Sequence, residues 1–153
     1  MSVRTLVAIS AVLFVLTVGT VSAEASPPWT TISRGAGTSP IHGGRSTAGV
    51  LIGSRRRLDA FPDLLEPGAG RCCGWYATFD WQQRAVLLVV AKVPHEFEIA
   101  RLTRRRSVLR VTIVPRYPGQ PDFAAPLTSW EAVSVPRSLL GHPLPRRMIV
   151  AAS

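Results

Sequence analysis

The sequence predicts an N-terminal signal peptide followed by one small, mainly β domain. The domain is expected to be an antiparallel β sandwich or barrel-like fold with one short α-helix. Residues 85–91 form an unbroken apolar run, which is typical of a central strand covered on both faces. Residues 108–114 alternate instead, with apolar side chains on one side and Arg110 and Thr112 on the other. A helical spacing of apolar residues is kept only over residues 55–61.

The first 23 residues have the layout of a secretory signal peptide. Arg4 precedes an uncharged run over residues 5–23, and Val21 and Ala23 fit a signal peptidase that cuts before Glu24. We therefore expect an exported protein, in the periplasm, the cell envelope or the extracellular space, with no membrane span after cleavage. The alternative is an uncleaved anchor, because the 19 residues of this run could just cross a bilayer.

After the signal, the chain divides by composition. Residues 24–47 are a Gly/Pro/Ser-rich stretch that predicts an irregular lead-in, with room for one short strand at 29–33. The ordered domain is expected over 48–137. It begins with an apolar run at 49–52 and continues with a helix that Ser54 caps and Pro62 stops.

The second half of the domain is expected to be strands. Residues 97–102 and 108–114 predict an amphipathic hairpin with a four-residue loop at 103–106. A last short strand follows at 129–135. Because Pro143 and Pro145 break any pattern, residues 138–153 are predicted to be a poorly structured tail that contains proline and arginine.

The chain is strongly basic, with 18 Lys and Arg against 9 Asp and Glu. Loss of Arg4 with the signal leaves a net charge of +8, which favours acidic partners, polyanions or anionic surfaces. The candidate binding residues are Arg104, Arg105 and Arg106, in the predicted hairpin loop. Two explanations that involve no binding function remain open. Such triplets are commonly solvated faces, and a GC-rich genome enriches arginine without selection for binding.

No motif for catalysis is present. The sequence contains neither G-x-S-x-G nor H-E-x-x-H, and its histidines, His42, His95 and His142, lack metal-ligand spacing. Gly35 and Gly37 are not followed by the third glycine of a phosphate-binding loop. We therefore expect no catalytic residue, no metal and no cofactor, so the protein is predicted not to be an enzyme.

Cys72 and Cys73 are adjacent. Their Cα atoms lie about 3.8 Å apart across a trans peptide, below the usual disulfide range of roughly 4.4 to 6.8 Å, so a bridge between them would be strained. Intermolecular bridging and buried structural thiols remain open, and no disulfide is assigned. The spacing does not support C-x-x-C redox chemistry.

The order of the strands and the residues between them resemble the PrcB C-terminal-like family. Trp29, Ile32 and Gly35 resemble its opening W-x-x-I-x-x-G, and Val135-Pro136-Arg137 resembles its closing valine-proline-basic step. Between these ends the likeness covers residues 50–54, 79–80, 86–93, 109–115 and 128–136. The chain departs from the family at residues 94–97, where Pro-His-Glu-Phe replaces a Gly-Gly-Tyr-like turn.

The family consists of exported accessory domains of bacterial protease complexes, so the resemblance implies a non-catalytic domain that binds another protein. The partner would be a protease or another envelope enzyme, which the domain would stabilise. The alternative function is an arginine-rich protein that binds a polyanion or a surface. A third hypothesis is an enzyme of a type that its sequence does not reveal.

Overall fold

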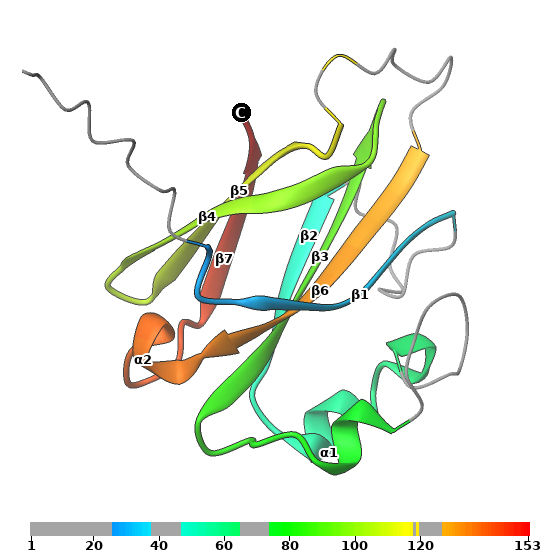
Figure 1. Ribbon diagram of the computed structural model, residues 1–153. Helices are drawn as coiled ribbons and strands as arrows, with labels where there is room; N and C mark the ends of the chain where they lie inside the picture. Colours follow the sequence, from blue (N-terminus) through cyan, green and yellow to red (C-terminus); the bar gives the residue numbers. More distant parts are fainter. Residues whose placement is uncertain (1–25, 38–46, 65–73, 118, 120–126) are drawn as a thin grey trace, which may run out of the picture.

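The computed structural model describes residues 26–37, 47–64, 74–117, 119 and 127–153. Two β-sheets pack face to face, and short helices cover the outer side of the larger sheet (Figure 1). The predicted mainly β, sandwich-like domain is confirmed. The predicted signal peptide, His42 and the pair Cys72-Cys73 lie outside the described residues.

The larger sheet has four strands in the order β1-β6-β3-β2. These strands are β1 (Thr30–Ala36), β6 (Leu127–Pro136), β3 (Arg84–Val93) and β2 (Thr47–Ile52), and all their pairings are antiparallel. In β3, residues 85–91 are all buried, so the predicted central strand is confirmed. The strand predicted at 129–135 corresponds to β6, which is not short but spans ten residues.

The smaller sheet has three strands in the order β4-β5-β7. They are β4 (Phe97–Arg105), β5 (Val108–Pro115) and β7 (Arg147–Ala152). The first two form the predicted antiparallel hairpin, but β5 and β7 are parallel. This one pairing departs from the predicted antiparallel arrangement: between β5 and β7 the chain crosses to the larger sheet as β6 and returns in the direction of β5.

Two apolar clusters explain why β3 is apolar on both faces. Between the sheets, alternate residues of β3 such as Leu87 and Val89 pack with Leu109 and Val111 of β5. The other side chains of β3 point to the outer face of the larger sheet, where three short elements and several aromatic side chains cover them. These elements are α1 (Arg55–Leu58), η1 (Pro62–Leu64) and η2 (Trp75–Ala77).

The predicted helix begins as expected and ends early. The Ser54 Oγ accepts a hydrogen bond from the Arg57 amide at 3.3 Å, which caps the first turn. The α-helix ends at Leu58, and a 3₁₀ turn begins at Pro62, which cannot continue an α-helix. A second short helix, α2 (Arg137–Leu140), follows β6, so the prediction of a single helix was incomplete.

The prediction of a poorly structured tail was wrong, because residues 138–153 contain most of α2 and the whole of β7. Met148 and Val150 of β7 pack against the core between the sheets. Ser153 extends the backbone pairing with β5, because its amide donates to the Ile113 carbonyl at 3.0 Å. The prolines at 143 and 145 precede the strand and do not interrupt it.

No helix within the described ranges is long and apolar enough to cross a bilayer.

Candidate functional site

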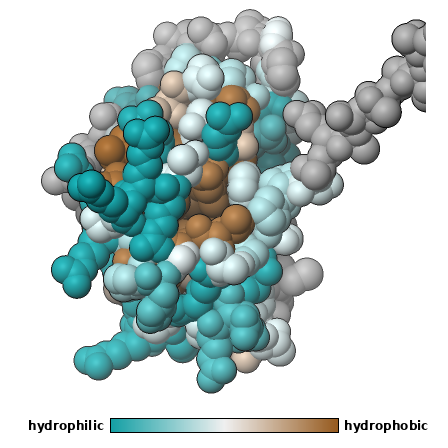
Figure 2. All heavy atoms as spheres, turned by 90° about the vertical axis from the view of Figure 1, so that its left-hand side faces the viewer, coloured by the Kyte–Doolittle hydropathy of each residue, from teal (hydrophilic) through white to brown (hydrophobic). Residues whose placement is uncertain are grey.

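The outer side of the three-stranded sheet carries a cluster of arginines. Leu109, Val111 and Ile113 of β5 point into the core, so the alternate residues of this strand point outward. We define the basic face by Arg101, Arg105, Arg110 and Arg147, together with the apolar side chains of Val108 and Ile149 that lie among them. Figure 2 views this side of the molecule, where hydrophilic side chains project around a hydrophobic patch.

The pairing register places these residues in three rows across β4, β5 and β7. The rows are Arg105, Val108 and Arg147, then Thr103, Arg110 and Ile149, then Arg101, Thr112 and Ala151. Neighbouring strands lie about 4.8 Å apart and every second residue about 6.7 Å along a strand, so diagonal neighbours are separated by about 8 Å at Cα. Arg110 is a diagonal neighbour of all three other arginines. The sheet therefore gathers charges that are far apart in the sequence.

A shallow hollow of about 490 Å³ lies on this face. It is lined by Arg101, Arg105 and Arg110, two threonines, Val108 and Ile149, with no acidic residue among them. Within the described ranges, none of the four arginine side chains of the basic face forms an ion pair. Ile149 is 36% exposed, whereas large apolar side chains are mostly buried elsewhere in the domain.

Other arginines have structural roles. The Arg137 guanidinium donates to the carbonyls of Trp81 at 3.0 Å and Gly53 at 2.5 Å. Arg84 donates to the Ser134 hydroxyl and carbonyl. These guanidinium groups satisfy backbone carbonyl groups of the fold, so the high arginine content does not by itself measure the binding surface.

The arginines of the predicted binding triplet, residues 104–106, do not share one role: some bind backbone carbonyls and others are exposed. The hairpin loop contains two residues, not four, because β4 continues to Arg105 and β5 begins at Val108. Arg104 points away from the basic face and donates to the carbonyls of Arg106 at 2.7 Å, Leu140, and Pro143 at 3.0 Å. Arg105 belongs to the basic face, and Arg106 is exposed in the turn with φ of 54°. The prediction of a four-residue loop is therefore wrong, and the loop does not present the three arginines together; their role in binding stays a prediction.

Three of the four arginines of the basic face, Arg101, Arg110 and Arg147, were not predicted as binding residues. Alternation in β5 already placed Arg110 opposite the apolar side, but nothing local paired it with Arg101 or Arg147. The six residues of β7 also alternate, with Met148 and Val150 inside and Arg147 and Ile149 outside. That alternation is the signal that could have identified the strand.

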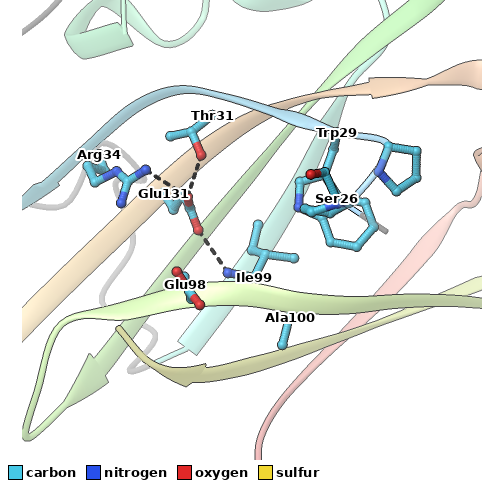
Figure 3. A pocket seen from close by; sticks show the side chains of 10 residues that line it. Ser26, Trp29, Thr31, Arg34, Glu98, Ile99, Ala100 and Glu131 are labelled. Atoms are coloured by element: carbon cyan, nitrogen blue, oxygen red, sulfur yellow. Dashed lines mark hydrogen bonds and ion pairs between the residues drawn. The ribbon is translucent and has the colours of Figure 1, made fainter. Parts of the chain in front are cut away.

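A second candidate site lies between the sheets, beside β1 and β4 (Figure 3). Glu131 of β6 lines this pocket of about 670 Å³ and is only 3% exposed. Its carboxylate accepts hydrogen bonds from the Thr31 hydroxyl and the Ile99 amide, both at 2.9 Å, and lies 3.8 Å from an Arg34 nitrogen. The carboxylate thus joins β6 of one sheet to β4 of the other.

The fold explains why Glu131 is needed there. The Arg116 amide donates to the Glu96 carbonyl at 2.9 Å, and backbone bonds alternate along an antiparallel pair, so the Ile99 amide points to the free edge of β4. A β-bulge follows between Ile99 and Arg101. Because an unpaired amide at an edge strand invites pairing with another chain, the carboxylate protects this edge as well as linking the sheets.

The arrangement around Glu131 is suited to anchoring. Both carboxylate oxygens already accept hydrogen bonds, and Glu98, the other acidic residue that lines the pocket, is exposed. In the part of the chain that the structure describes, no three His, Cys, Asp or Glu side chains are grouped to hold a metal ion. His95 is half-buried in the β3–β4 turn, and His142 is exposed after α2.

No protein-family model matches this chain, and no curated protein or solved structure gives a significant match. The chemistry of the two sites is therefore the basis for a function.

Proposed function

We propose that this chain is a non-catalytic binding domain that holds an acidic surface of another protein on its basic face. The observation that carries the proposal is the cluster of four arginines, without ion pairs among the described residues, around exposed Ile149. Keeping four positive side chains together costs electrostatic free energy unless a partner of opposite charge is present. The cluster comes from three strands and is a product of the fold.

The composition of the basic face suits a protein partner. Guanidinium groups bind carboxylates through paired hydrogen bonds, and arginine is enriched in protein interfaces. Val108 and Ile149 add apolar area that gains free energy when a partner covers it. A face that combines both features can provide charge steering during association and apolar contact in the complex.

The identity of the partner is proposed from the sequence. The resemblance of residues 29–137 to the PrcB C-terminal-like family suggests an exported protease, or another envelope enzyme, that the domain stabilises. The predicted signal peptide would bring the domain to the same compartment. Binding through a sheet face needs no catalytic group, in keeping with the absence of catalytic motifs from the sequence.

A second candidate function is binding of a polyanion such as a sulfated or phosphorylated polymer. The absence of acidic side chains from the lining of the hollow favours it. The logarithm of the affinity for a polyanion falls linearly with the logarithm of the salt concentration. The slope depends on the number of charges that the protein neutralises. Salt dependence therefore separates the two functions.

The test compares two double variants that each remove two positive charges. Arg105→Ser with Arg110→Ser changes the basic face, whereas Arg56→Ser with Lys92→Ser changes exposed residues of α1 and β3. We expect the parent and the control variant to capture the same proteins from the exported fraction. The basic-face variant should no longer capture them. Equal retention by both variants would refute the proposal. Heparin retention of the parent that falls steeply with salt, without any captured protein, would support the polyanion function instead.

A further inference from the structure

Resting on the proposed function, we infer that the basic face recognises an acidic segment in which an apolar side chain lies between two carboxylates. The apolar side chain would fill the hollow against Ile149 and Val108, and the carboxylates would pair with the surrounding arginines. This inference specifies the chemistry of the partner segment. It also assigns the specificity to Ile149.

Val108 and Ile149 lie where an apolar side chain of a partner could cover them. Val108 lies between Arg105 and Arg147 in one row, and Ile149 lies beside Arg110 in the next. Ile149 is among the few large apolar side chains that the structure shows exposed, and it lines the hollow. Covering it with an apolar side chain removes unfavourable contact with water, whereas covering it with phosphate or sulfate gains nothing.

The spacing of the arginines matches the spacing of side chains along an extended segment. Arg105 and Arg147 are separated by two strand spacings, or about 10 Å, and Arg101 and Arg105 by four residues, or about 13 Å. In an extended segment, side chains at positions i, i+2 and i+4 point to one side, and the outer two lie about 13 Å apart. A segment that lies over β5 would place its residue i between Arg105 and Arg147, its residue i+4 beside Arg101, and its side chain at i+2 beside Ile149. Carboxylates at i and i+4 can therefore reach these arginines while the side chain at i+2 enters the hollow.

Two peptides test the inference by titration into the ¹⁵N-labelled protein, followed by NMR. One is Ser-Glu-Ser-Leu-Ser-Glu-Ser, and the other has Ser in place of Leu, so their charges are the same. We expect shifts on β4, β5 and β7, with at least tenfold tighter binding of the leucine peptide. In the variant Ile149→Ser, the two peptides should bind equally. In the control variant Leu139→Ser, which changes an exposed apolar residue of α2, the tenfold difference should persist.

The outcomes separate this inference from the proposed function. Equal binding of the two peptides to the parent, or no binding of either, would overturn the inference. If both bind equally and both are lost with Arg105→Ser and Arg110→Ser, the basic face still binds acidic segments and the proposed function stands. If capture of the exported partner is also insensitive to these arginines, both proposals fail.

Discussion

Replacement of Glu131 by alanine tests whether one buried carboxylate links the two sheets. The substitution removes the acceptor of the Ile99 amide and of the Thr31 hydroxyl. The Ile99 amide is then left without its partner inside the sandwich, which costs about 1 to 3 kcal/mol. Loss of the bond from Thr31 adds about 1 kcal/mol, and loss of the partly exposed Arg34 pair adds less than about 1 kcal/mol.

The expected total is a loss of about 3 kcal/mol in the free energy of unfolding, a large share of the roughly 5 to 15 kcal/mol of a typical domain. Glu131→Gln keeps the shape and one acceptor oxygen, so it should cost about half as much. Glu98→Ala changes the exposed carboxylate that lines the same pocket. It serves as the matched control and should stay within about 0.5 kcal/mol of the parent.

Urea unfolding followed by circular dichroism measures these differences, provided that the three variants keep the slope of the parent. A Glu131→Ala variant as stable as Glu98→Ala would show that the carboxylate does not link the two sheets. If Gln were no better than Ala at position 131, the side chain would act through its charge and not through the hydrogen bonds from Thr31 and Ile99.

Three further predictions concern the packing. Val89→Asp should abolish cooperative thermal unfolding, since both faces of β3 are buried; a soluble variant that melts cooperatively would contradict this. Arg104→Ala should lower stability by about 1 to 2 kcal/mol through its lost carbonyl partners, yet leave peptide binding unchanged in the NMR titration; weaker binding would place Arg104 on the binding surface. Gly35→Ala would place a Cβ 2.9 Å from the Trp130 indole and should cost about 1 to 3 kcal/mol in urea unfolding; parental stability would show that the indole can move.

The parts of the fold that the sequence predicts are those with a local cause. The apolar run of β3 and the alternation of β5 each specify a strand without reference to any partner. Strand β7 was missed because Pro143 and Pro145 dominate the approach to it, and because its neighbour β5 is far away in the sequence. Alternation over six residues is a weak signal beside two prolines.

The candidate site was predicted in its charge but not in its position. Three consecutive arginines at 104–106 stand out in a sequence, but successive side chains of a strand point to opposite faces, so Arg104 and Arg105 separate as soon as β4 extends this far. The basic face needs the register of three strands, which no single segment contains. Glu131 was also missed, because its role depends on a backbone amide that another strand, β4, directs to its free edge.

The position of β6 in the larger sheet sets the order in which the domain can be assembled. Both β1 and β3 pair with β6, and they do not pair with each other. As the chain is synthesised, β1 must therefore wait for a partner that begins only at Leu127. Until then one whole edge of the apolar strand β3 lacks its neighbour, and the nascent chain has to be kept from aggregating. A fragment that stops before β6 should accumulate as aggregate, whereas the complete chain closes the sheet in a late step.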